Sequence, residues 1–282
     1  MKTNRIFLVG CPRSGTTLLQ SMIASHSQVV SFPETHFFSE TLSINPLLRR
    51  VKLYGPGSRD FIADFLGRHN YTDIYPFTKL PPFCTHNRWC RTLLRTIDKM
   101  ILAESENLNS NNVWGMEKTP RHLFYISSIQ QEGYQNKFLH ILRNGPDVVA
   151  SLYLATQNYP DQWGGSRSVK KCISWWNNSI KESLKYEDDS NHLFVTYEQL
   201  LINPQTTLEA ICNFMEIDYQ ETMTEDFHNT AGSLTKEEER WKQKNAEKSL
   251  QKSNKLQEHF DDETIDYIKK SVLNIDLTKF HH

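Results

Sequence analysis

One short segment near the start of the chain constrains the fold more than any other. Residues 5–9 form a β-rich apolar run, the loop GCPRSG follows at residues 10–15, and apolar residues at helical spacing begin after Thr16. A glycine-rich turn between a strand and a helix presents the unpaired N–H groups of the helix start, which bind anions well. The segment therefore predicts a buried strand, an anion-binding loop and a helix, in that order.

The same alternation of short apolar runs and helical patterns continues along the chain. Parallel strands joined by helices produce it, so we expect an α/β fold, a parallel sheet with helices on both faces, in a single domain over residues 1–282. The predicted strands are Arg5–Val9, Gln28–Phe32, Val113–Met116, Lys137–Leu142 and Leu193–Tyr197. The predicted helices are Thr16–His26, Pro120–Gln131, Pro146–Ala155, Val169–Tyr186 and Pro204–Met215.

Two segments interrupt this pattern. Residues 40–112 hold Gly- and Pro-rich turns and short helical patches, and we interpret them as an insertion over the strand ends. The aromatic residues there and just before it either line an apolar pocket or form a small core of their own. They are Phe37, Phe38, Phe61, Phe65, Tyr71, Tyr75, Phe77, Phe83 and Trp89. Residues 228–256 are rich in Lys, Glu, Gln, Asn and Ser, which favours a solvated, flexible loop.

Composition narrows the classes of partner. The 282 residues carry 32 Lys and Arg against 33 Asp and Glu, a formal charge of −1, whereas generic binders of nucleic acid or anionic membranes carry a basic excess. A local site must therefore hold any anion. The apolar run at the start is too short for a signal peptide, no run is long enough to span a membrane, and five cysteines lack metal-ligand spacing. We expect a cytoplasmic protein with reduced thiols.

The loop at residues 10–17 departs from the nucleoside-triphosphate pattern in one informative way. Its spacing matches G-x-x-x-x-G-K-[ST], but Thr16 stands where the lysine belongs. That lysine normally reaches the β- and γ-phosphates, and Arg13 inside the loop is the nearest basic residue here. The loop therefore suits one phosphate with an adjacent negative group better than a triphosphate.

The run CPRSGTTLL at residues 11–19 resembles the 5′-phosphosulfate loop of sulfotransferases that use 3′-phosphoadenylyl sulfate (PAPS) as donor. The resemblance implies a P-loop NTPase-like sulfotransferase fold with a mainly helical insertion, PAPS as co-substrate and no metal. It also implies that Arg13 contacts the 5′-phosphate and the bridging oxygen. The residues that would supply N–H and hydroxyl donors are Ser14, Gly15, Thr16 and Thr17.

A second segment supports the same resemblance. LHILRNGPDVVASLY at residues 139–153 is similar to the family's 3′-phosphate motif, a strand ending in arginine and a helix with a serine eight residues later. Arg143 at a strand end can form charge-assisted hydrogen bonds to a phosphate. Ser151 on the following helix can converge on the same oxygens. The two phosphate motifs occur in the expected order.

Similarity extends to FVTYEQLLINP at residues 194–204, where the tyrosylprotein branch of the family has a tyrosine, here Tyr197, at the nucleotide. Lys255 matches a phosphate-binding lysine of that branch, and residues 228–256 would then cover the nucleotide. Glu239 stands where that branch has a catalytic-site serine, which argues against close kinship with tyrosine sulfation. The resemblance spans about residues 5–217, with 40–112 largely unmatched.

Sulfuryl transfer to a hydroxyl needs a base for the acceptor's proton and a positive group beside the leaving phosphate. Glu34 follows the second predicted strand and falls where the tyrosylprotein branch has its catalytic glutamate. His36 is the rival base, because the pKa of histidine lies nearer neutrality. Lys118 lies in GMEKTP, which resembles the family's E-K-T-P or N-K-D-P segment and implies that it stabilises charge on the leaving group.

Two other functions remain open on the sequence alone. One is a P-loop kinase with a degenerate loop, which would need ATP and Mg²⁺. The other is a protein that binds adenosine 3′,5′-bisphosphate without catalysis, which would not need Glu34 or Lys118. For the sulfotransferase, the partners are a nucleotide donor and a hydroxyl-bearing acceptor, either a small molecule, a sugar or a tyrosyl side chain.

Overall fold

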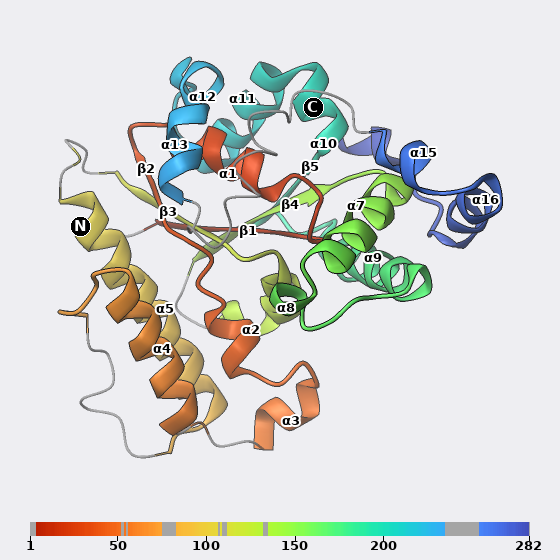
Figure 1. Ribbon diagram of the computed structural model, residues 1–282. Helices are drawn as coiled ribbons and strands as arrows, with labels where there is room; N and C mark the ends of the chain where they lie inside the picture. The colour runs from red at the N-terminus through yellow and green to blue at the C-terminus, as the bar shows by residue number, and fades with distance from the viewer. Residues whose placement is uncertain are drawn as a thin grey trace.

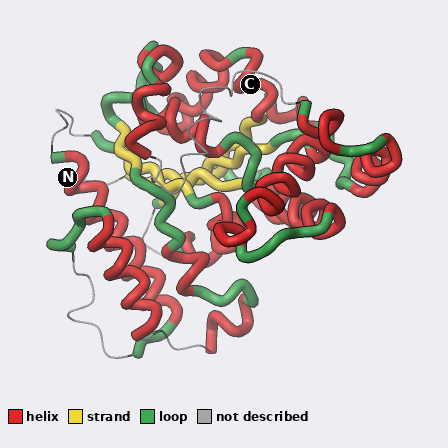
Figure 2. Tube along the Cα trace, viewed as in Figure 1, coloured by secondary structure: helices red, strands yellow, loops and turns green. Residues whose placement is uncertain are grey.

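The computed structural model describes residues 4–51, 54, 56–74, 83–106, 108, 112–131, 135–234 and 254–281. Five strands form one parallel sheet in the order β2-β3-β1-β4-β5, which crosses the middle of the molecule (Figures 1 and 2). The strands are β1 Asn4–Gly10, β2 Val29–Ser31, β3 Trp114–Lys118, β4 Asn136–Leu142 and β5 His192–Thr196. The α/β fold predicted from the sequence is confirmed.

The central strand β1 is buried on both faces of the sheet. Ile6 and Leu8 pack on one side and Phe7 and Val9 on the other, all four with no exposed surface. A strand covered on both faces cannot alternate polar and apolar residues, so the continuous run IFLV is what a central parallel strand requires. Helices therefore have to cover both faces.

Three groups of helices provide this cover (Figure 1). The first packs against Ile6 and Leu8 and comprises α1 Thr16–Ala24, α10 Tyr197–Ile202, α11 Pro204–Met215, α12 Thr222–Glu225 and α13 Phe227–Leu234. The second lies on the opposite face and comprises α2 Phe37–Thr41, α3 Pro46–Val51, α4 Pro56–Arg68, α5 His86–Ser105, η1 Pro120–Tyr125 and α6 Ile126–Ile129. The third comprises α7 Gly145–Asn158, α8 Pro160–Trp163, α9 Val169–Ser183, η2 Leu184–Tyr186, α15 Lys255–His259, α16 Asp262–Ser271 and η4 Leu277–Phe280.

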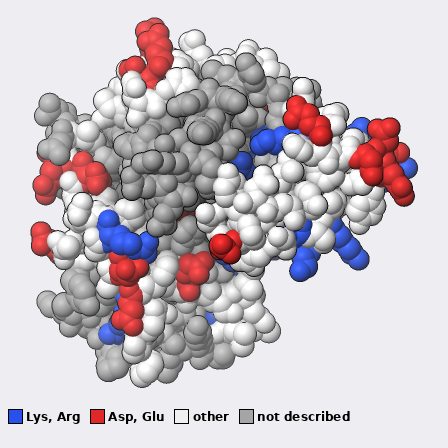
Figure 3. Space-filling view, in the orientation of Figure 1, with Lys and Arg blue, Asp and Glu red and all other residues white. Residues whose placement is uncertain are grey.

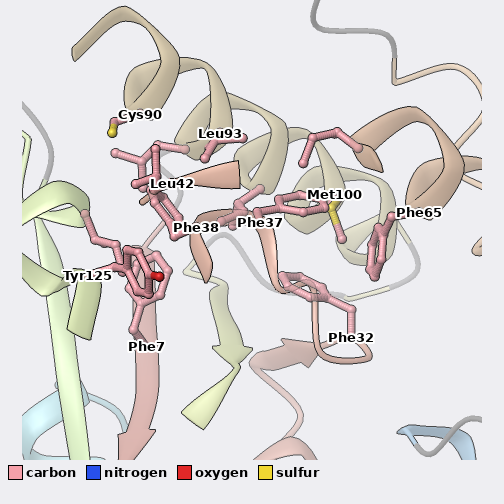
Figure 4. Close-up of a cluster of buried hydrophobic side chains, with 14 of the residues drawn as sticks. Phe7, Phe32, Phe37, Phe38, Leu42, Phe65, Cys90, Leu93, Met100 and Tyr125 are labelled. Carbon is pink, nitrogen blue, oxygen red and sulfur yellow. The ribbon is translucent and has the colours of Figure 1, made fainter. Parts of the chain in front are cut away.

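The described part of residues 40–112 is mainly helical, as expected. Most of the aromatic side chains singled out there form a core: Figure 4 shows Phe37 and Phe38 of α2 packed with Phe7 of β1 and Phe65 of α4. The rings of Phe37 and Phe65 meet edge to face, with centroids 5.0 Å apart. Phe83 is exposed, and residues 75 and 77 lie outside the described residues. The core interpretation, and not the pocket, accounts for the buried members.

Some predicted boundaries were wrong. Residues 120–131 do not form one α-helix, because a 3₁₀ helix, η1, precedes the short α6. Tyr197 does not end a strand: the Thr196 hydroxyl accepts a hydrogen bond from the Gln199 N–H at 3.2 Å, which caps α10 and starts it at Tyr197. Residues 228–234 belong to α13, while 235–253 lie outside the described residues.

No helix within the described residues combines the length and the apolar character needed to cross a membrane. All five cysteines are buried and none forms a disulfide.

Two buried histidines lie side by side on β4 and β5. His140 Nε2 and His192 Nδ1 are 2.9 Å apart, and their rings stack on Phe194 and Phe138 with centroids 4.4 and 4.6 Å apart. Burial lowers the pKa of His192 to about 4. Burial also lowers the pKa of His140 well below its ordinary value, and the neighbouring His192 ring adds to that shift. Both rings are therefore neutral at pH 7.

Acidification should destabilise the fold through these histidines. In the unfolded chain they bind protons near pH 6.5, whereas folded His192 does so only near pH 4, so the unfolded state binds more protons between those values. We expect His192 alone to lower the free energy of unfolding by about 2 kcal/mol between pH 7 and pH 5. Urea unfolding at both pH values measures this, and His192→Phe should flatten the dependence while exposed His228→Gln should not. A free energy independent of pH over this range would contradict the prediction.

Candidate active site

The parallel sheet brings the predicted site residues to one edge. Because all five strands run the same way, their carboxyl ends meet there, which is where α/β sheets bind ligands. Following the order of the strands across the sheet, these positions are Glu34 after β2, Lys118 at the end of β3, Arg13 in the loop after β1, Arg143 after β4 and Tyr197 after β5.

The loop after β1 wraps tightly around the start of α1. Gly15 has a φ of 96°, and a Cβ there would lie 2.3 Å from Cδ2 of Tyr197, so only glycine fits. Ser14 N donates to the Cys11 carbonyl at 3.2 Å and closes the turn. No described side chain caps α1 at its first turn, which leaves the N–H groups of Thr16 and Thr17 directed toward the loop.

The two predicted phosphate motifs meet at Arg13. Its Nε donates to Ser151 Oγ at 3.2 Å, and Arg143 Nη1 donates to the Arg13 carbonyl at 3.3 Å. The Arg143 guanidinium also lies over the Tyr197 ring, 4.1 Å from its centroid. Residues from the two motifs, far apart in the sequence, therefore lie together beside the loop after β1.

This place is strongly cationic. Burial and the neighbouring Arg143 lower the pKa of Arg13 to about 10, and burial, Arg13 and Arg143 lower the pKa of Lys255 at the start of α15. Lys and Arg side chains appear at the inner edge of the lobe that holds α7, α15 and α16 (Figure 3). Clustered cations depress one another's pKa, and a bound anion would relieve that repulsion.

Two buried polar atoms beside the loop have no hydrogen-bond partner within the described structure, Ser14 Oγ and Arg143 Nε. Buried donors are normally paired, and an unpaired one at a site of this charge fits an anionic ligand. Together with the predicted residues around them, they have the chemistry needed to hold two phosphate groups. Of residues 228–256, which the resemblance places over the nucleotide, 235–253 lie outside the described residues.

A carboxylate and an ammonium group lie side by side next to this cationic region. Lys118 Nζ is 2.6 Å from Glu34 Oε1, and His36 Nε2 is 3.4 Å from Glu34 Oε2. Lys118 and Glu34 are 4% and 12% exposed, so water screens their interaction only weakly. Burial lowers the pKa of His36, although the charge of Glu34 opposes the shift. The two regions adjoin because β3 pairs with β1, with Lys118 opposite Leu8, and the charge of Glu34 accordingly opposes the lowering of the Arg13 pKa.

Sequence reasoning missed one charged residue at this edge, Glu117. The residue is 1% exposed, and its carboxylate accepts hydrogen bonds from Thr35, Thr119 and His122. Burial alone would raise the pKa of Glu117, but the His122 ring and the two threonine hydroxyls outweigh it and hold that pKa below its ordinary value. The only sequence signal is the polar run EKT at a strand end, which does not reveal burial.

No group of three or more His, Cys, Asp and Glu side chains in the described part of the chain is arranged to hold a metal ion.

Curated relatives are similar at low identity. The chain is 24% identical over 228 residues to protein-tyrosine sulfotransferase 2 of Gallus gallus, covering 77% of this chain and 52% of that protein. It is 21% identical over 226 residues to an uncharacterised protein of Aquifex aeolicus (strain VF5), covering 78% and 26%. The chain thus spans about half the length of the first relative and about a quarter of the second.

Solved structures share the fold. The sulfotransferase domain from the curacin biosynthetic pathway superposes with a TM-score of 0.53 at 15% identity, covering 97% of this chain and 99% of that one. Mouse sulfotransferase SULT7A1, solved in complex with PAP, superposes with a TM-score of 0.53 at 13% identity, covering 95% and 82%. The sequence model described as the sulfotransferase family matches residues 5–221 of the 282, and the chain therefore belongs to the sulfotransferase family.

Proposed function

We propose that this protein transfers a sulfuryl group from PAPS to a hydroxyl acceptor and releases adenosine 3′,5′-bisphosphate (PAP). The observation that carries the proposal is the junction of the two phosphate motifs, with Arg143 Nη1 3.3 Å from the Arg13 carbonyl and Ser151 Oγ 3.2 Å from Arg13 Nε. PAPS carries a phosphate at the 5′ position of its ribose and another at the 3′ position, so its binding site needs two anion-binding groups close together. The PAP complex of the mouse relative supports the same donor.

In this reaction the acceptor oxygen forms a bond to sulfur while the bond from sulfur to the 5′-phosphate oxygen breaks. The hydroxyl proton moves to the Glu34 carboxylate, and PAP departs with the electron pair of the broken bond. Lys118 stabilises the charge that grows on the leaving oxygen, because a fixed cation in a site with little water interacts strongly with it. Arg13 acts on the same charge from the β1 side.

His36 remains the alternative base. Its lowered pKa leaves the ring neutral and able to accept a proton, and it lies beside Glu34. Glu34 is favoured because it falls where the tyrosylprotein branch has its catalytic glutamate, and Lys118 Nζ, 2.6 Å from Oε1, fixes the position of its carboxylate. One carboxylate and one cation in contact place the proton acceptor next to the group that stabilises the leaving charge.

The acceptor belongs to one of three classes: small molecules, sugars and tyrosyl side chains. The curated relative from Gallus gallus acts on protein tyrosine by its name, so a tyrosyl peptide belongs in any acceptor panel. The cytoplasmic location expected from the sequence stays a prediction.

Nucleotide selectivity separates the proposal from the kinase alternative. We expect PAP at about 100 times its Kd to raise the Tm by roughly 5 °C or more, and ATP with Mg²⁺ to have little effect. Arg143→Ala should remove most of the PAP shift, since it deletes a charge-assisted hydrogen bond to phosphate. Arg68→Ala, an exposed arginine of α4 paired with Asp64, is the matched control. Stabilisation by ATP with Mg²⁺ but not by PAP would overturn the proposal.

Removing the base should separate catalysis from binding. With labelled PAPS and a panel of phenols, sugars and a tyrosyl peptide, Glu34→Gln should lower kcat by roughly 100- to 10,000-fold. Its Kd for PAP should change little, because the residues proposed to bind the phosphates lie in the loop after β1, directly after β4 and on α7. Glu40→Gln in α2, exposed and paired with Arg121, serves as control. Normal turnover by Glu34→Gln would transfer the role of base to His36, and His36→Ala would then be the inactive variant.

A further inference from the structure

Glu117 is a buried carboxylate whose oxygens accept hydrogen bonds from three residues. Its Oε1 accepts from Thr35 N at 3.3 Å, Thr35 Oγ1 at 2.8 Å and Thr119 Oγ1 at 2.6 Å, and its Oε2 accepts from His122 Nδ1 at 2.8 Å. A buried charge is costly unless hydrogen bonds replace the lost water, and here four donors do so.

The network ends on four consecutive backbone N–H groups at the start of α2. Thr35 N reaches Glu117 directly, and His36 N donates to Thr119 Oγ1 at 3.2 Å. Phe37 N donates to Thr35 Oγ1 at 3.3 Å, and Phe38 N donates to His122 Nε2 at 3.2 Å. Each of these acceptors in turn donates to Glu117. One carboxylate therefore binds the whole backbone segment 35–38.

The direction of the protons is fixed. Because Phe38 N is a donor, Nε2 of His122 must be an acceptor, so the ring hydrogen sits on Nδ1 and points at Glu117. The two threonine hydroxyls accept from main-chain N–H groups through their oxygens, and each donates its own hydrogen to Glu117 Oε1. The ionised carboxylate, with acceptors only, is the one group that fits all the donors.

This segment lies beside the proposed reacting groups. Thr35 follows Glu34 and Glu117 precedes Lys118, so the hydrogen bond from residue 35 to residue 117 and the ion pair from residue 34 to residue 118 join the same two segments of the chain. His36 has a left-handed backbone with a φ of 54°, a conformation that needs support from its surroundings. The burial of Phe37 and Phe38 fixes the other end of the segment (Figure 4).

We infer that Glu117 is a positioning residue for the transfer reaction: through Thr35, Thr119 and His122 it holds Glu34 in place against Lys118. The inference rests on the proposed function, since it assigns Glu117 no contact with either substrate. The nucleotide affinity of the proposed site depends on Arg13, Arg143 and Ser151, which lie in the loop after β1, directly after β4 and on α7, so disturbing Glu117 acts on kcat.

Glutamine cannot replace Glu117 without a mismatch. An amide has one acceptor oxygen, so its NH₂ group must face either His122 Nδ1 or the two threonine donors. If His122 moved its hydrogen to Nε2, that hydrogen would face Phe38 N–H. Two donors would then oppose each other at the start of α2.

The test compares catalysis with binding. Glu117→Gln should lower kcat by roughly 100-fold, as small displacements of reacting groups do, and leave the Kd for PAP within about threefold. Thr35→Val removes one hydroxyl with little change of shape. It should lower kcat by a smaller factor and also leave the Kd for PAP nearly unchanged. This variant tests the inference if Glu117→Gln does not fold. Thr207→Val in α11 is the control, because among the described residues its buried hydroxyl binds only Asn203 O, at 3.1 Å. This variant should reduce Tm without reducing kcat.

A spectroscopic readout tests the network without turnover. In protein labelled with ¹⁵N-histidine, the His122 resonances should show the Nδ1-protonated tautomer, and Glu117→Gln should change them. An Nε2-protonated His122 in the unmodified protein would overturn the inference. Two kinetic results would also overturn it: a normal kcat in folded Glu117→Gln, or equal losses of kcat in Thr35→Val and Thr207→Val. Failure of the unmodified protein to bind PAP would instead overturn the proposed function and leave the tautomer result standing.

Discussion

The parallel direction of the five strands is the constraint on which the site depends. It brings the carboxyl ends of all five strands to one edge of the sheet, and the order of the strands then sets the order of the site residues along that edge. Glu34 and Lys118 come from β2 and β3, the loop from β1, and Arg143 and Tyr197 from the far side. With β1 at the centre, the loop lies between the ion pair and the second arginine, so neither half of the site could be moved without a change of topology.

The two halves differ in how their charges are balanced. Around the loop, Arg143 lowers the pKa of Arg13, and both arginines lower the pKa of Lys255, because like charges lie close together there. On the β2 and β3 side, Glu34 and Lys118 neutralise each other at 2.6 Å. A nearly neutral chain can thus hold a region of strong local charge. The cationic group around the loop and the neutralised ion pair follow neighbouring strands, β1 and β3.

Much of this arrangement was predictable because it depends on local pattern. The loop at residues 10–17, the apolar strands and the arginine at a strand end are each visible within a few residues of sequence. The positions that escaped prediction depend on distant contacts. Burial of Glu117 requires Thr35 and His122 from other elements, and the start of α10 at Tyr197 depends on capping by Thr196. Patterns of hydrophobicity carry no information about such hydrogen bonds.

The contact between Gly15 and the Tyr197 ring has a consequence for how the protein is made. The loop emerges from the ribosome early, whereas the ring that closes against it arrives only with the last strand. Contacts between such distant parts of a chain form slowly. A nascent chain that already carries both arginines would still lack the Tyr197 ring beside the loop. The ability to bind nucleotide therefore marks completion of the whole sheet.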